Sequence, residues 1–297
     1  MSPSSVSAPT VPVRDLLAQS QNPDGGWGYF PRKQSWLEPT AYAWLALLNT
    51  PNSAPVLERA LALILSWQRP DGGWSPNGQV KESTWVTSLA LTVLSAARQT
   101  SGAPFQRGID WLMGFEGSEG GLFNRLTARL GLVDPGRDVS LTGWPWLAGT
   151  SSWVEPTAHA LTALRKAAGR TDIAARIDTG AKQIWSLRCA DGGWNYGAPN
   201  ALHVNLPSYP ETTALALIAL AGTGQPKLSQ AVDHARALAA QPQSPMASAW
   251  LTIALRLHGA EPPASLAAPG PESDLLVNSL YALAEPTGNW HLLGGAR

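Results

Sequence analysis

Three glutamates occupy matching positions in a repeated segment, and they are the residues best suited to chemistry in this sequence. Glu38 and Glu155 each precede Pro-Thr-Ala, and Glu211 precedes Thr-Thr-Ala. Carboxyl groups that approach one another share a proton, because two close negative charges disfavour ionisation, and such a group serves as a general acid. The other interpretation is structural, because a glutamate before proline is typical of a helix start. We expect these three glutamates to be catalytic.

Aromatic residues gather around the same positions. The faces of Trp and Tyr attract cations by roughly 0.5–2 kcal/mol each, so they suit a reaction with a positively charged intermediate. They also suit a packed core. His159 follows Glu155 by four residues, which predicts either a pair with that carboxylate or a buried neutral histidine. The expected substrate-binding residues are Trp36, Trp44, Trp85, Trp144, Trp146, Trp153, His159 and Tyr209.

The glutamates and most of these aromatic residues lie near the starts of uncharged segments that alternate with charged, amphipathic ones, whereas Trp144 and Trp146 lie in an expected inserted loop. The uncharged segments are 39–50, 84–97, 156–164, 212–222, 245–255 and 275–284. A helix that is apolar all round is buried on every side, whereas an amphipathic helix faces solvent on one side. The alternation predicts an all-α fold, an (α/α)6 toroid in which an inner ring of helices is wrapped by an outer ring.

The predicted toroid is one domain over residues 11–297, after a disordered tail at 1–10. An inserted loop is expected at about 122–150. A degenerate sixth outer helix is expected at about 260–272, where proline is frequent. The connections that lead into the uncharged helices are long, at 69–83, 117–153 and 189–210. Because long loops on a rigid scaffold often carry function, this rim is the expected mouth of a central pocket.

A glycine-rich motif precedes these helices. Asp-Gly-Gly-Trp begins at Asp24, Asp71 and Asp191, and a degenerate copy, EGGLF, begins at Glu119. The first two intervals are 47 and 48 residues, and the third, 72, is longer by about 24. The glycines permit a tight turn after an outer helix, and the tryptophan is expected to pin neighbouring repeats together.

Gln-x-x-Asp-Gly-Gly-Trp followed by an apolar helix resembles the QW repeat of squalene–hopene cyclases and related class II terpene cyclases, in the superfamily that includes the protein prenyltransferases. The resemblance implies an α/α barrel with an aromatic-lined cavity for an isoprenoid substrate. It also implies a carboxyl acid at the start of an inner helix, within an Asp-x-Asp-Asp-Thr-Ala segment. That segment is absent here; Glu38, Glu155 and Glu211 align with the acid, and Thr87 takes its place in the second repeat.

Composition excludes several classes of protein. Lys and Arg total 21 and Asp and Glu total 21, so the chain lacks the basic excess of a nucleic-acid-binding protein. The single cysteine, Cys189, and the absence of an Asp-x-Cys pair disfavour disulfides and a zinc site, and no metal or cofactor is expected. No leader and no apolar run of about 20 residues stands in the sequence, so we expect a cytoplasmic protein, with peripheral membrane contact left open.

Three functional hypotheses follow. The first is a terpene cyclase-like enzyme, a lyase or isomerase, that binds an isoprenoid or a similar apolar substrate and uses carboxylate general-acid chemistry. The second is a non-catalytic toroid that binds a lipid, a peptide or a protein. The third is a polysaccharide-active barrel with paired carboxylates. Hopene cyclases place their cavity between two helical domains, and this chain has one, so the resemblance implies a second helical domain or a homodimer as partner, or else a smaller substrate.

Overall fold

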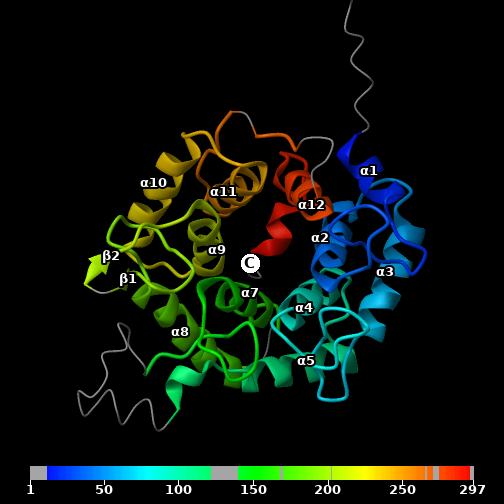
Figure 1. Cartoon of the computed structure of the whole chain (residues 1–297), viewed down its shortest axis with the longest axis horizontal. Helices are drawn as coiled ribbons and strands as arrows, with labels where there is room; N and C mark the ends of the chain where they lie inside the picture. The colour runs from blue at the N-terminus through cyan, green and yellow to red at the C-terminus, as the bar shows by residue number, and fades with distance from the viewer. Residues whose placement is uncertain are drawn as a thin grey trace, which may run out of the picture.

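The inner helices of the protein form a closed ring. The computed structural model describes residues 12–121, 140–167, 170–201, 203–264, 266–269 and 274–294. Each inner helix packs on the next, and the last packs on the first (Figure 1). In ring order, these helices are α2 (Leu37–Leu47), α4 (Thr87–Ala96), α7 (Val154–Leu164), α9 (Pro210–Leu220), α11 (Pro245–Leu257) and α12 (Leu275–Ala284). Nearly every residue of α2, α7 and α9 is buried, as expected for helices without a polar face.

Amphipathic helices wrap this ring. The outer helices are α1 (Val13–Gln19), α3 (Ala54–Ser66), α5 (Ala103–Gly114), α8 (Thr171–Ser186) and α10 (Leu228–Ala239). The helices α3, α5, α8 and α10 each pack on the inner helix of their own hairpin, and α10 also packs on α11. The first outer helix, α1, lies against both α2 and α12. This arrangement confirms the predicted all-α toroid.

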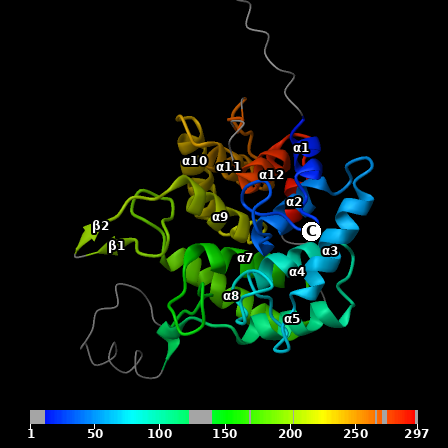
Figure 2. The same cartoon turned by 45° about the vertical axis from the view of Figure 1, so that its right-hand side comes forward.

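Several predicted segments lie wholly or partly outside the described residues. The predicted tail at 1–10 does so entirely, and of the predicted loop at about 122–150 only residues 140–150 are described. None of residues 260–264 and 266–269, in the predicted sixth outer helix, is helical. The strands of the described chain, β1 (Asn200–Ala201) and β2 (Val204–Asn205), pair antiparallel with Asn200 opposite Asn205, and the hairpin projects from the ring before α9 (Figure 2).

The three Asp-Gly-Gly-Trp turns each join an outer helix to the next inner helix, α1 to α2, α3 to α4 and α8 to α9. Trp74 is fully buried; its indole Nε1–H donates to the Ile64 carbonyl of α3 at 2.7 Å, and its backbone N–H donates to Thr87 Oγ1 of α4 at 2.8 Å. Gly72 has a φ of +96°, a conformation that favours glycine. Trp27 and Trp194 make the same two contacts, with Leu17 and Thr40, and with Ile184 and Thr213.

The third repeat departs from its predicted alignment. Trp144 makes the motif contacts there, with Leu112 O at 2.8 Å and Thr157 Oγ1 at 2.9 Å, and the EGGLF phenylalanine lies outside the described residues. Glu119 does occupy the position that aspartate has in the other motif turns. Its carboxylate accepts the Ser152 backbone N–H at 3.0 Å, as the Asp191 carboxylate accepts the Ser208 backbone N–H. The insertion therefore separates the acid of this turn from its tryptophan.

The last described residues close the ring. The Asn289 side-chain amide donates to the carbonyls of Leu45 and Leu48 at the end of α2, and Leu275 N–H donates to Tyr29 O at 2.6 Å. The short helix η2 (Trp290–Leu293) follows and packs against α4 and α11 in the middle of the ring (Figure 1). Leu293 borders a cavity of about 10 Å³ that His159 and Trp250 also line.

Candidate functional site

The three predicted glutamates all lie in the first turns of inner helices. Glu38 stands on α2, Glu155 on α7 and Glu211 on α9, and each has an extended residue as N-cap. All three are partly buried. The second repeat shows an error in the predicted alignment: Thr87 accepts the Trp74 N–H as Thr40 accepts the Trp27 N–H, so Thr87 corresponds to Thr40. The position of the glutamates is then held by Trp85.

The acidity of Glu155 is strongly perturbed. Burial raises its pKa from 4.5 to about 8, and the negative charges of Glu38 and Glu211 raise it further in the same direction. Its side chain is 24% exposed. Glu155 therefore carries a proton at neutral pH, in contact with the surface.

Glu38 is held by a phenol. The Tyr29 hydroxyl donates to Glu38 Oε2 at 2.5 Å. Burial raises the pKa of Glu38, the Tyr29 hydrogen bond opposes this by stabilising the ionised form, and the charge of Asp274 adds to the rise. The sequence did not predict the contact with Tyr29. That residue lies in the loop before α2, where no helical spacing relates it to Glu38.

His159 lies below Glu155, toward the middle of the ring. Its Nε2 atom is 4.0 Å from Glu155 Oε1 and 3.5 Å from the Tyr42 hydroxyl. Burial lowers the pKa of His159 to about 3, so the ring is neutral at pH 7 and the pair with Glu155 is not an ion pair. The imidazole instead belongs to an aromatic cluster with Trp85, at 5.4 Å between ring centres, and Trp250, at 6.3 Å. Trp250 was not expected there, although it stands on a predicted inner helix.

The other expected aromatic residues divide into two groups. Trp146 meets Trp85 edge to face at 4.8 Å, and Trp36 lies 6.2 Å from Tyr29, the partner of Glu38. Trp153 is 38% exposed and Tyr209 is 42% exposed, each directly before an inner helix. Trp85, Trp146 and Trp153 form, together with the three glutamates Glu38, Glu155 and Glu211, a six-residue set that we call the glutamate rim.

Two of the expected residues lie elsewhere. Trp144 is buried in its motif turn beneath the Arg176 guanidinium, whose carbon is 3.5 Å from the ring centre. Trp44 is buried near the other end of α2, where its Nε1–H donates to Leu57 O at 3.1 Å. Trp44 lies more than one helical turn beyond the start of α2, so it is not at the glutamate rim. Trp144 is not at the rim either, because its indole is buried in the turn that joins α5 to α7.

Large apolar side chains are exposed around this rim. Unburied clusters of this kind mark interaction sites or ligand grooves in many proteins. They stand in the loops that enter α2, α7 and α9: Phe30, Leu147, Trp153, Tyr196, Val204 and Tyr209.

No group of three or more His, Cys, Asp or Glu in the described ranges is arranged to hold a metal ion. Cys189 is buried, and burial raises the pKa of its thiol. Among the helices that the structure describes, none is long and apolar enough to cross a membrane.

Comparison with known proteins places the fold. No family model matches the chain. A drimenyl diphosphate synthase from Streptomyces showdoensis is 47% identical over 60 residues, which are 20% of this chain and 11% of that protein. The match thus spans a small part of the relative.

Solved structures match over most of the chain. A variant of the type II terpene cyclase MstE from Scytonema, in complex with its substrate geranylgeranyl dihydroxybenzoate, superposes with a TM-score of 0.57 at 21% identity, over 91% of this chain and 74% of that one. The endoglucanase Cel10 from Klebsiella pneumoniae superposes with a TM-score of 0.59 at 14% identity, over 92% and 97%.

These matches confirm that the chain has a terpene cyclase-like α/α toroid, as the repeat predicted. Because one such toroid is a terpene cyclase and another a glycoside hydrolase, the fold alone does not decide the reaction.

Proposed function

We propose that this protein binds an isoprenoid chain at the glutamate rim and that Glu155 donates a proton to it. The observation that carries the proposal is a carboxyl group whose pKa of about 8 keeps it protonated at pH 7, beside aromatic faces. The sequence match to a terpene synthase and the fold shared with MstE support this class of substrate.

The carboxyl groups of the glutamate rim both donate and recover the one proton that the proposed reaction needs. The proton of Glu155 adds to one carbon of an alkene, the π electron pair forms the new C–H bond, and the neighbouring carbon becomes a cation. A second alkene of the chain attacks that cation and closes a ring. A carboxylate then removes a proton from a carbon beside the final cation, so the product is an isomer of the substrate and the rim regains its proton.

A pKa of about 8 has two consequences for this acid. It keeps the proton on Glu155 at pH 7, but it also weakens the acid, so transfer depends on stabilisation of the cation that forms. Trp85, Trp146 and Trp153 offer aromatic faces, worth roughly 0.5–2 kcal/mol each. Glu38 and Glu211 contribute negative charge from both sides, as their effect on the pKa of Glu155 indicates.

The substrate is proposed to lie across the rim, above the ring centre. The cavity beside His159 has a volume of about 10 Å³, roughly the space that one water molecule needs. An isoprenoid does not fit there. The exposed apolar residues around the rim, such as Phe30 and Tyr196, favour a covering partner, and we propose a second helical domain or a second copy of the chain.

Incubation in D2O tests the proposed acid. Wild-type protein and prenyl substrates of 10 to 20 carbons are incubated in D2O, and the products are extracted and analysed by mass spectrometry. We expect a cyclised or isomerised product that carries one deuterium from the acid. Glu155→Gln is expected to lower the rate at least 100-fold. Glu82→Gln, an exposed glutamate in the loop before α4, is the matched control and is expected to keep the wild-type rate.

Two outcomes would contradict the proposal. Wild-type turnover by Glu155→Gln would remove its role as acid. Absence of turnover by the wild type, together with binding of a lipid, peptide or protein at the rim, would support the alternative, a non-catalytic binding toroid.

A further inference from the structure

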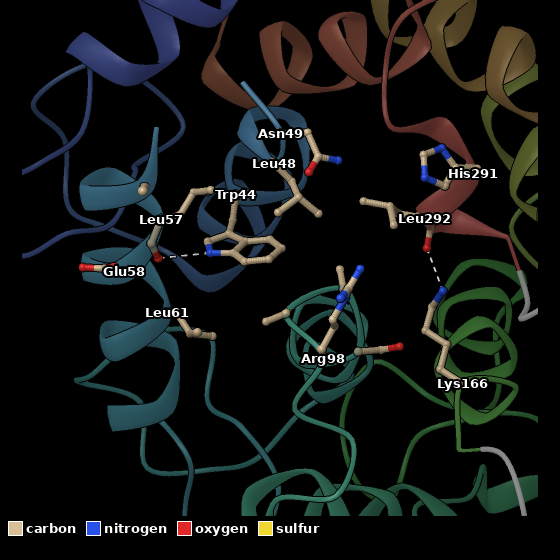
Figure 3. Close-up of a pocket in the computed structure, with 14 residues that line it drawn as sticks. Trp44, Leu48, Asn49, Leu57, Glu58, Leu61, Arg98, Lys166, His291 and Leu292 are labelled. Carbon is tan, nitrogen blue, oxygen red and sulfur yellow. Dashed lines mark hydrogen bonds between the residues drawn. The ribbon is translucent and has the colours of Figure 1, made fainter. Parts of the chain in front are cut away.

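A second pocket opens at the opposite end of the ring from the glutamates. It lies where the inner helices α2, α4 and α7 end, about 15 Å along the helix axes from the glutamate rim. Its volume is about 660 Å³, within the range of sites that hold small organic ligands. We call it the lower pocket, and Figure 3 shows the residues that line it.

One wall of the lower pocket is apolar. Trp44 presents its indole there, fixed by the hydrogen bond from Nε1 to Leu57 O. Leu48, Leu57 and Leu61 continue this wall and are only partly buried, so apolar surface is open to a ligand (Figure 3). Such a wall favours an alkyl or prenyl chain, because covering apolar surface removes it from water.

The other wall carries positive charge. Lys166 donates from Nζ to Leu292 O at 2.7 Å and to Gly294 O at 2.8 Å, so one of its three N–H groups remains for another acceptor. No described carboxylate lies within ion-pairing distance of it, and burial lowers its pKa to about 8. In Figure 3, Glu58 extends away from Trp44 and away from the two cations, Lys166 and Arg98.

Arg98 is the second cation of the lower pocket. Its guanidinium is exposed and extends between the apolar wall and Lys166 (Figure 3). Its backbone has a φ of +59°, directly after α4, where glycine is the favoured residue. Neither the backbone nor a described hydrogen bond requires an arginine here. Its charge is therefore available to a ligand.

We propose that the lower pocket binds an amphipathic anion, a carboxylate or phosphate head group on an apolar chain. The head group lies between Arg98 and Lys166, and the chain lies along Trp44, Leu57 and Leu61. Hydrogen bonds from charged donors to such a head group are about twice as strong as neutral ones. This site is separate from the glutamate rim, so it stands or falls independently of the proposed reaction.

Calorimetric titration of the full chain tests the proposal with three probes of equal chain length: dodecanoate, dodecyl phosphate and the uncharged dodecanol, each below its aggregation concentration. We expect one anion to bind per chain, at least tenfold more tightly than dodecanol. The comparison of the two anions shows whether the site prefers a carboxylate or a phosphate.

Two substitutions in the pocket and one control outside it locate the site. Arg98→Gly removes the charge and suits the backbone conformation, so the fold is kept, and it is expected to weaken binding of the anion at least tenfold. Arg32→Gly makes the same change at another exposed residue of φ +63°, in the loop before α2, and is expected to leave the affinity unchanged. Ala54→Phe adds bulk at an exposed position of the pocket and is expected to weaken binding without a change of charge.

Three results would overturn the proposal. These are equal affinity for dodecanol and the anions, wild-type affinity in Arg98→Gly, and absence of saturable binding. Binding that survives Arg98→Gly but is lost in Trp153→Ser would place the ligand at the glutamate rim and would overturn it as well.

Discussion

Glu155 and His159 are both neutral at pH 7, and burial is the first cause in each case. Burial disfavours charge, so it raises the pKa of the acid to about 8 and lowers that of the base to about 3. The two groups are 4.0 Å apart, so the rim holds a proton donor directly above an uncharged aromatic cluster. A cation formed there meets no competing positive charge from the histidine.

The pKa of Glu155 predicts a pH dependence of stability. The folded protein keeps a proton on Glu155 up to about pH 8, whereas an unperturbed glutamate of the unfolded chain loses it near 4.5. The free energy of unfolding therefore falls as the pH rises from about 4.5 to 8. His159 acts in the opposite direction, between about pH 3 and 6.5, because there the unfolded chain holds the extra proton.

Comparison with Glu155→Gln isolates the glutamate, because His159 is present in both proteins. The measurement is urea unfolding from pH 5 to pH 9. We expect the free energy of unfolding of the wild type to fall relative to the variant by on the order of 3 kcal/mol across this range. Parallel profiles would show that Glu155 has an ordinary pKa in the folded protein.

At the scale of elements, four threonines repeat one contact. Thr40, Thr87, Thr157 and Thr213 each accept the backbone N–H of a motif tryptophan through Oγ1. The contact ties the start of an inner helix to the turn before it, so it fixes where the rim glutamates stand, two residues earlier in three of the four repeats.

Substitution of one of these threonines tests how much the contact contributes to the free energy of unfolding. Thr87→Val keeps the shape but leaves the buried Trp74 N–H without an acceptor, and we expect a loss of about 1–3 kcal/mol in the free energy of unfolding. The matched control is Thr92→Val on the same helix, because its hydroxyl donates to Ser88 O, a carbonyl that also accepts a helical hydrogen bond. Equal losses in the two variants would refute a special role for Thr87.

The sequence predicted which segments are helices better than it predicted how the repeats align and which residues lie at the rim. Uncharged segments identify the inner helices because burial on every side excludes charge, whatever the details of packing. The third repeat was misread because the insertion moves Trp144 away from Glu119, and the EGGLF motif offered a nearer aromatic residue. Trp44 was misplaced because an uncharged helix does not show which of its residues lies at the rim.

At the scale of the whole molecule, we expect the Cys189 thiol to react with thiol reagents only after the protein unfolds, because the folded chain buries it. The residue is 4% exposed and burial raises the pKa of its thiol, so the thiol is neither accessible nor ionised at pH 7. We expect labelling by a thiol reagent to follow the loss of helical circular dichroism in urea. Ser101→Cys in a Cys189→Ala background, at an exposed position, is the control and is expected to react at once. Immediate labelling of the wild type would show that this turn opens locally.

Closure of the ring has a consequence for synthesis on the ribosome. Asn289 holds the end of α2 from 244 residues further along the chain, at Leu45. The hairpin of α2 and α3 is therefore synthesised before α12, which packs on one side of α2, and an apolar flank of α2 stays uncovered until α12 has been translated. A solenoid stabilises each repeat as it appears, but this toroid does not, so we expect its early hairpins to be the segments that chaperones bind.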